Sequence, residues 1–114
     1  MKIIYNKLIP VKGFYAISLF GLLFVRDEKG EKEPVSKVTV NHETIHYYQQ
    51  REMLFIFFFL WYLIEWIVKL FKYGTKDSKA YYNLSFEREA YINEHNPDYL
   101  KNREPYAWCK YIKF

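Results

Sequence analysis

The sequence predicts an α+β fold that is predominantly helical. Residues 41–73 contain no glycine or proline, which is typical of a long helix. Residues 1–40 contain short apolar, aromatic and β-branched stretches punctuated by glycine, which is typical of strands. Hydrophobic residues make up 51% of the chain, which is too much apolar material for a disordered protein.

The length of 114 residues favours one domain, residues 1–114, with a core of modest size. Aromatic residues make up 22% of the chain, and the surface of a small protein cannot easily keep so much apolar material from water. We therefore expect membrane lipid, or further copies of the chain in a homo-oligomer, to cover part of the surface.

Charge and the N-terminal segment narrow the choice of partner and location. The net charge is +4 and the basic residues are dispersed, so we expect no nucleic-acid partner and a weak attraction to anionic lipid. Cys109 is the single cysteine, which excludes an intrachain disulfide. Asn6, Pro10 and Lys12 interrupt the first apolar stretch, so we recognise no signal peptide there.

The first forty residues predict short strands and a hairpin. The stretch "GFYAISLFGLLFVR" holds aromatic and β-branched residues, and "VSKVTV" alternates apolar with polar positions. The polar stretch "DEKGEKEP" lies between them. We expect a hairpin of residues 14–26 and 35–40, followed by a helix that begins at Asn41 or near Ser36, because either side chain can cap a helix.

The helix predicted from residue 41 runs into an apolar segment, Met53–Phe71, whose only charges are Glu65 and Lys69. Nineteen helical residues would be about 28 Å long, close to the thickness of a bilayer's hydrocarbon layer. Gly74 is the expected stop. A second helix is expected over residues 78–95, followed by a basic aromatic tail over residues 96–114.

The stretch "HETIH" points to a metal site. His42 and His46 are four residues apart, so on a helix both imidazoles lie on one face and can bind one ion. Glu43 lies about 100° further round the helix, where it can take a proton from a water bound to that ion. This spacing favours zinc, with Glu43 as the general base. The alternative is an ordinary helix with two surface histidines and a solvated glutamate.

A catalytic zinc ion needs a third protein ligand, and the sequence offers three candidates. Glu87 and Glu89 both lie in "SFEREAY", and each shares a helix face with partly apolar neighbours, so periodicity alone does not separate them. His95 would lie about 12 Å along the helix axis from Glu87, so it could replace that residue only if the helix shifted by two turns.

"HETIH" followed by "FEREA" resembles the gluzincin metallopeptidases, most closely the membrane-embedded group that includes the CAAX prenyl proteases. In that group the leading glutamate of E-x-x-A-D is the third zinc ligand. The resemblance implies a minimal zincin-like domain with Glu87 in that role. Tyr91 stands where the group has aspartate, which removes one expected support of the ligands. The chain also resembles a small family that shares its "NHE-x-IH-x-x-Q", "YLIEW" and "FEREAY" blocks, which brings no established activity.

The apolar segment limits how such a site can form. If Met53–Phe71 crossed a bilayer, His46 and Glu87 would lie on opposite sides, because the roughly fifteen residues after Phe71 are too polar to return through lipid. We favour a helix that lies in the membrane interface or in the core, with the chain folding back along it. Otherwise Glu87 belongs to a partner subunit's site, or is not a ligand.

These observations predict a membrane-associated zinc metallopeptidase-like protein that cleaves a peptide or protein substrate. The edge of an N-terminal strand would hold the extended peptide, and Tyr91 or His95 would stabilise the oxyanion. The alternative is a non-catalytic metal-binding structural or interaction protein of the membrane, since 14.1 kDa leaves little room for a walled cleft. A di-iron carboxylate protein is less favoured, because Glu43 and His46 form the chain's single E-x-x-H.

Overall fold

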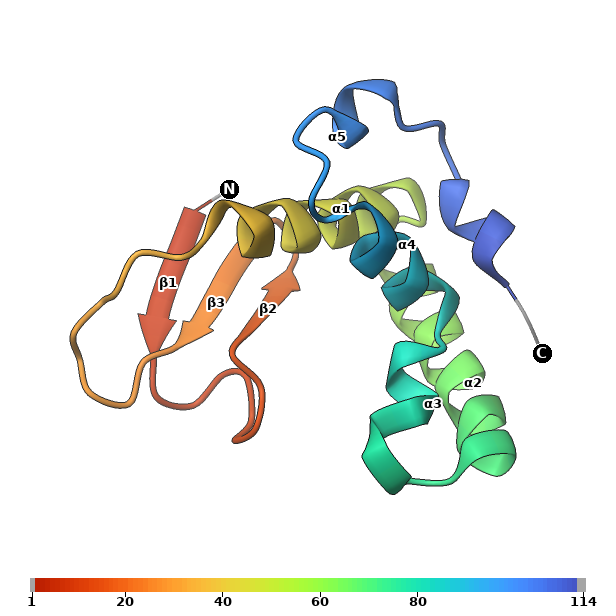
Figure 1. The fold of residues 1–114 in the computed structure, drawn as a ribbon, viewed down its shortest axis with the longest axis horizontal. Helices are drawn as coiled ribbons and strands as arrows, with labels where there is room; N and C mark the ends of the chain where they lie inside the picture. The colour runs from red at the N-terminus through yellow and green to blue at the C-terminus, as the bar shows by residue number, and fades with distance from the viewer. Residues whose placement is uncertain (1, 113–114) are drawn as a thin grey trace.

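A computed structural model describes residues 2–112 of the protein. Three strands come first, followed by helices to the end of the described chain (Figure 1). The strands are β1 (Lys2–Asn6), β2 (Ala16–Leu19) and β3 (Leu22–Arg26). The helices are α1 (Lys37–Glu52), α2 (Ile56–Tyr73), η1 (Lys76–Ser78), α3 (Lys79–Tyr82), α4 (Ser85–Asn93), α5 (Tyr99–Asn102) and η2 (Ala107–Tyr111). The α+β class predicted from the sequence is confirmed.

The sheet has the order β1-β3-β2, so β2 is an edge strand. β1 pairs with β3 in parallel, and β2 pairs with β3 in antiparallel. The hairpin turn consists of Phe20 and Gly21, both with positive φ (52° and 86°), as two-residue hairpin turns require. A Cβ atom on Gly21 would lie 3.1 Å from the Tyr47 ring, so glycine also lets the turn approach α1 closely.

The predicted hairpin between residues 14–26 and 35–40 is wrong in its second strand. The hairpin lies entirely within residues 16–26, and residues 37–40 form the first turn of α1. Ser36 is the N-cap, and its hydroxyl accepts a hydrogen bond from the Thr39 backbone N–H at 3.1 Å. This cap favours a helix over the strand that the alternating pattern suggests.

The predicted continuous helix over residues 41–73 is also wrong, because α1 and α2 are separated at Met53–Phe55 and bent by 111°. Leu54 and Phe55 have positive φ (54° and 61°), which costs on the order of 1 kcal/mol for each residue. The Phe55 ring packs on Phe20 of the hairpin turn at 5.4 Å between centroids. This tertiary contact offsets local strain that the sequence pattern does not predict.

The helix predicted over residues 78–95 is divided as well, into α3 and α4, with Asn83–Leu84 between them. The segment after Pro97 forms α5 and η2, and Trp108 of η2 is buried against Phe58 and Phe86 in the small aromatic core. The expected basic aromatic tail is therefore packed against the protein at η2, whereas α5 buries no residue. Residues 113–114 of that tail lie outside the described residues.

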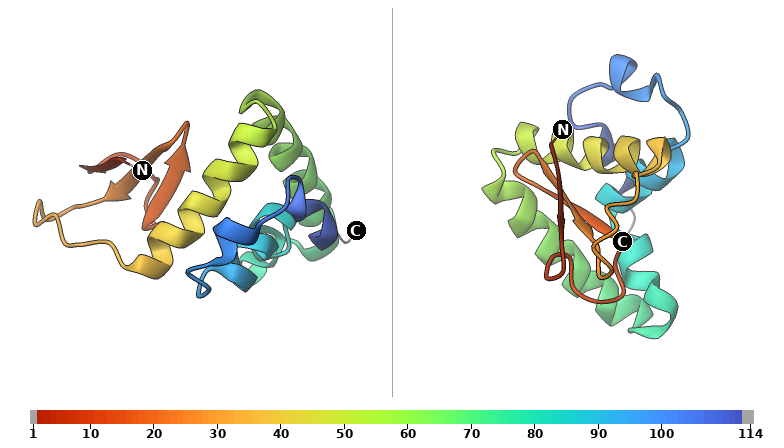
Figure 2. Two further views of the ribbon diagram at one scale, coloured as in Figure 1. Left: turned by 90° about the horizontal axis from the view of Figure 1, so that it is seen from above. Right: turned by 90° about the vertical axis from the view of Figure 1, so that its left-hand side faces the viewer.

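α1 lies in the middle of the molecule, with the sheet on one side and α4 on the other (Figure 2). After α2 the chain turns back, and α3 packs beside α2 (Figure 1). Within residues 2–112, no single helix is long and apolar enough to cross a membrane; α1 and α2 pass that test only as one bent pair. This course of the chain brings α4 alongside the histidines of α1.

Candidate metal centre

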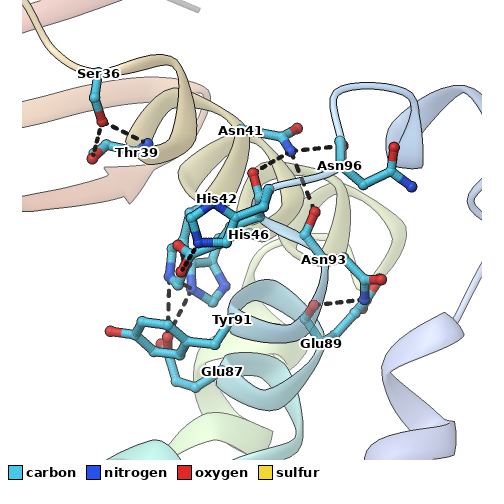
Figure 3. A network of polar contacts seen from close by, with 12 residues as sticks. Ser36, Thr39, Asn41, His42, His46, Glu87, Glu89, Tyr91, Asn93 and Asn96 are labelled. Carbon is cyan, nitrogen blue, oxygen red and sulfur yellow. Dashed lines mark hydrogen bonds and ion pairs between the residues drawn. The ribbon is translucent and has the colours of Figure 1, made fainter.

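His42 and His46 of α1 meet Glu87 of α4 in a buried group (Figure 3). The two histidine Nε2 atoms are 3.2 Å apart. Glu87 Oε1 lies 3.0 Å from Nε2 of His46 and 3.4 Å from Nε2 of His42. The residues are only 5%, 6% and 4% exposed, in the order His42, His46, Glu87. These three side chains could hold one metal ion.

The spacing of the three atoms fits a tetrahedral metal. Bonds of about 2.0–2.1 Å in tetrahedral geometry place neighbouring ligand atoms roughly 3.3 Å apart. The three separations of 3.0, 3.2 and 3.4 Å lie around this value. The group therefore presents one face of a coordination tetrahedron, whose fourth ligand would have to come from outside these three side chains.

Each histidine is oriented through its other ring nitrogen. Nδ1 of His42 lies 3.0 Å from Glu94 Oε2, and Nδ1 of His46 lies 2.8 Å from Gln49 Oε1. An acceptor on Nδ1 fixes the proton there and leaves Nε2 free for a metal. Glu94 thus places a carboxylate next to His42. Tyr91 stands at the position where the CAAX prenyl protease group, which the sequence resembles, has aspartate. The Tyr91 ring instead packs on His42 at 4.4 Å between centroids.

α4 is held at both ends by side chains from other helices. Glu65 of α2 accepts hydrogen bonds from the backbone N–H of Ser85 and, at 2.7 Å, from its hydroxyl, at the N-terminus of α4. Asn41 of α1 donates to the backbone oxygens of Glu94 and Asn96, at 2.8 and 3.0 Å, at the C-terminus. These contacts satisfy groups that a helix end leaves unpaired, and they fix which side of α4 faces α1.

Glu43 lies beside this group in a cavity of about 510 Å³, which is also lined by His46 and Glu87. It is 8% exposed. Burial raises its pKa, although the charges of His46 and His42 and a backbone hydrogen bond from Ser18 act in the opposite direction. A raised pKa brings a carboxylate closer to the range in which it can exchange protons near neutral pH.

The rest of the cavity wall is mainly apolar. It comes from the loop before β2, from β2 itself and from α2. The apolar lining residues are Leu8, Ile9, Pro10, Val11, Phe14, Ala16, Ile17, Leu19, Phe58, Phe59 and Trp66. The polar ones besides the site residues are Ser18, Gln50, Tyr62 and Tyr81.

Charge couples the members of the group when no metal is bound. Burial alone would lower the pKa of His46, but the Glu87 carboxylate outweighs it and raises that pKa to about 9. Burial alone would raise the pKa of Glu87, but the His46 charge and the hydrogen bonds from both histidines hold it well below its usual range. The metal-free site is therefore an imidazolium–carboxylate pair, and a metal ion would displace the His46 proton.

The other third-ligand candidates lie elsewhere. Glu89 is fully buried, but its carboxylate oxygens contact Gln49, Tyr99 and Arg103 rather than the histidines. The side chain of His95 is 76% exposed. Glu87 is the candidate that the fold brings to His42 and His46.

Two tyrosines of the cavity were not anticipated from the sequence. The Tyr62 hydroxyl donates to Glu87 Oε2 at 3.2 Å, and the Tyr81 hydroxyl lies 3.3 Å from that of Tyr91. Tyr62 and Tyr81 both line the cavity, whereas Tyr91 and His95, the expected oxyanion donors, do not. Tyr62 begins the "YLIEW" block, which carries no established role, and no motif marks Tyr81; both reach the site through the packing of α2 and α3.

The edge of β2, where we expected a peptide to bind, is partly occupied. Gln50 of α1 donates to the Ser18 carbonyl at 2.7 Å and accepts from the Phe20 N–H at 3.2 Å. The Ser18 backbone also donates to Glu43. An extended peptide could therefore pair with this edge only beyond Ser18, towards Ala16.

Comparisons of this chain with protein-family models, with curated proteins and with solved structures found no match. Function is therefore inferred from the buried group of His42, His46 and Glu87 and from the cavity beside it.

Proposed function

We propose that this protein is a membrane-associated, zinc-dependent metallopeptidase with a minimal zincin-like arrangement. His42, His46 and Glu87 would be the metal ligands and Glu43 the general base. One observation carries the proposal: the buried carboxylate of Glu43 lines the same cavity as two of the three ligand residues. A purely structural metal site has no use for a buried acid beside an open position.

Zinc is the metal that the donor set favours. Two imidazoles and one carboxylate with a free fourth position are a common set for catalytic zinc. Zinc held there would lower the pKa of a bound water towards 7 and polarise a carbonyl group. The lowered pKa of Glu87 supports the donor set, because His46 and His42 stabilise this residue in the carboxylate form that binds a metal ion.

The side chains of the site would then take separate roles in proton transfer and in stabilising the oxyanion. Glu43 accepts a proton from the attacking water on its carboxylate and passes it to the leaving amine. Tyr81 brings a hydroxyl group to the cavity wall and is better placed than Tyr91 or His95 to donate to an oxyanion, whereas the single proton of the Tyr62 hydroxyl is donated to Glu87. Tyr62 thus fixes Glu87 through this hydrogen bond.

The cavity favours a peptide with apolar side chains next to the cleaved bond. Its wall combines the aliphatic loop before β2 with aromatic residues of α2, and the few polar groups gather around the candidate metal centre. An apolar side chain would gain roughly 1.5–3 kcal/mol from burial there.

Membrane association rests on the surface of α2. Residues at helical spacing along α2 form an exposed apolar face, named here the outer face: Ile56, Phe57, Leu60, Leu63, Ile64, Ile67, Val68 and Phe71. Leu8 and Val11, which line the cavity, are 82% and 67% exposed. An uninterrupted apolar surface of this length in water is unfavourable, whereas a helix lying in the membrane interface would cover it.

The test combines metal analysis with peptide cleavage. We expect purified protein to hold about one zinc per chain and to cleave peptides with apolar residues at the cut site. Glu43→Gln should keep the zinc, because Glu43 is not among the ligands, and should lose activity by roughly 10²–10⁴-fold. Glu31→Gln, which changes an exposed glutamate in the loop before α1, is the matched control and should leave both unchanged.

Each contrary result points to a different conclusion. Zinc without cleavage of any peptide in a broad library would favour the non-catalytic metal-binding alternative. Equal activity in wild type and Glu43→Gln would remove Glu43 as the base. Iron in place of zinc would move the reaction to another class, since two histidines and a carboxylate also suit iron.

A further inference from the structure

A chain of buried polar contacts leads from His46 to the C-terminal segment. Gln49 Oε1 accepts from Nδ1 of His46 at 2.8 Å. Gln49 Nε2 donates to Glu89 Oε1 and to the Phe86 carbonyl, both at 3.0 Å. Gln49 and Glu89 are both 0% exposed. None of these contacts with Gln49 belongs to the catalytic roles assigned above.

The direction of the Gln49 amide follows from its neighbours. Its nitrogen lies between a carboxylate oxygen and a carbonyl oxygen, which are both acceptors, so the oxygen must face His46. An oxygen at that position requires a proton on Nδ1 of His46, and Nε2 is then the atom left to bind a metal. Glu89 therefore acts on the tautomer of His46 through the orientation of Gln49.

Arg103 holds Glu89 in place. Its guanidinium donates to both carboxylate oxygens of Glu89, at 2.5 and 3.1 Å, and Tyr99 donates to the same carboxylate at 2.6 Å. Arg103 also donates to both oxygens of Glu52, at the end of α1, at 2.8 and 3.1 Å. A guanidinium can serve two carboxylates in this way because its N–H groups form a rigid planar fork.

We propose that Gln49, Glu89 and Arg103 are positioning residues of the metal centre, through which docking of the C-terminal segment sets the affinity for zinc. This inference rests on the proposed metal site. It gives Glu89 a function even though it is not a ligand. It also explains why the Arg103 side chain, remote from the histidines in sequence, is only 3% exposed and contacts both α1 and α4.

The experiment measures zinc affinity by competition with a chelator, together with ¹⁵N NMR shifts of the His46 ring. Glu89→Gln keeps the shape of the side chain but presents an amide to both Arg103 and Gln49, so we expect about 10- to 100-fold weaker zinc binding. At a pH well above 9, where the metal-free His46 ring is neutral, it should show a reduced share of the Nδ1–H tautomer. Glu104→Gln, an exposed acid on the same segment, is the matched control.

Arg103→Lys is the second variant, for use if Glu89→Gln does not fold. It keeps the charge but loses the fork, so we expect a weakening between those of wild type and Arg103→Met. Thermal unfolding of the metal-free forms separates positioning from general stability. A purely structural role would lower the melting temperature without changing the zinc affinity of the folded protein or the His46 tautomer.

The outcomes separate this inference from the proposed function. Wild-type protein with no affinity for zinc would overturn both. Wild-type protein that binds zinc, with unchanged affinity and tautomer in Glu89→Gln and Arg103→Lys, would overturn the positioning role alone.

Discussion

α1 and α2 follow one another in the chain and both bury mainly polar side chains, but α2 also exposes a long apolar face. α1 has 16 residues, and its buried residues are His42, Glu43, Ile45, His46, Gln49 and Gln50, of which Ile45 alone is apolar. α2 has 18 residues, exposes the apolar outer face and buries Phe58, Glu65 and Lys69. Each helix is thus reversed relative to a helix of an ordinary small globular protein.

Both helices therefore carry features that by themselves destabilise a folded protein in water. Burying polar groups is unfavourable unless each finds a partner, and the described contacts of α1 provide those partners for His42, His46, Gln49 and Gln50. An exposed apolar helix is unfavourable in water unless another phase covers it. The polar interior of α1 points to chemistry, and the apolar exterior of α2 points to lipid.

The largest expected effect comes from breaking the polar interior of α1. His46→Ala should weaken zinc binding at least about 1000-fold, because it removes a ligand and leaves Glu87 buried without its imidazolium partner. Metal content after dialysis measures the loss. His95→Ala changes the exposed third histidine and should leave the zinc content unchanged. Unchanged zinc content in His46→Ala would show that the zinc is not held by α1.

Glu65 is a buried polar residue of α2 that contacts α4, as His46 of α1 does. Glu65→Ala should lower the free energy of unfolding by about 3 kcal/mol, because the start of α4 loses its acceptor in a buried position. Zinc affinity should fall with it, since Glu87 lies in the first turn of α4. Denaturant unfolding measures the change, and Glu104→Ala should stay within about 0.5 kcal/mol of wild type. A normal stability in Glu65→Ala would mean that α4 needs no cap from α2.

The outer face of α2 can be broken without touching the site. Leu60→Gln combined with Ile64→Gln removes two side chains that are 52% and 45% exposed. We expect binding to zwitterionic vesicles to fall about 10- to 100-fold in a flotation assay, with zinc content unchanged. Ile92→Gln changes an equally apolar, 65% exposed residue of α4 and should bind vesicles as wild type does. A monodisperse, lipid-free wild-type monomer would argue that water tolerates the outer face.

The smallest effect is the pH dependence of the metal-free protein. The pKa of His46 rises from 6.5 to about 9 in the fold, so its stabilisation is complete below pH 6.5 and is lost as the pH rises through 9. The pKa of Glu87 is lowered, so its stabilisation is present above pH 4.5 and is lost towards acid. With a chelator present, the melting temperature should fall by on the order of 5 °C between pH 6.5 and 9.5.

Replacing the titrating ring is the control for this prediction. His46→Gln should flatten the alkaline part of the profile and also weaken the acid part, because the His46 charge helps to hold down the pKa of Glu87. Zinc should reverse the alkaline trend, because binding requires His46 to lose its proton. A fall in melting temperature that persists in His46→Gln would assign the pH dependence to other groups.

Sequence reasoning failed where a helix cap or a long-range contact outweighed the pattern of apolar and polar residues. The strand expected at residues 35–40 is the capped start of α1, and the continuous helix expected through residue 73 is broken at Leu54 and Phe55. Glu94, which supports His42, follows no motif that could have identified it. The break between α1 and α2 and the contact of Glu94 depend on residues that lie far apart in the chain, such as Phe20 and Phe55, whereas the start of α1 depends on the local cap at Ser36.

The sequence by itself determined that His42 and His46 share one face, because i, i+4 spacing is a property of every α-helix. It also determined that a carboxylate, Glu43, lies next to that face. Only the tertiary structure decided that Glu87, rather than Glu89, meets the histidines. These two glutamates lie roughly 200° apart around α4, so the rotation of that helix selects between them. That rotation is fixed at its two ends by Glu65 and Asn41, which belong to other helices.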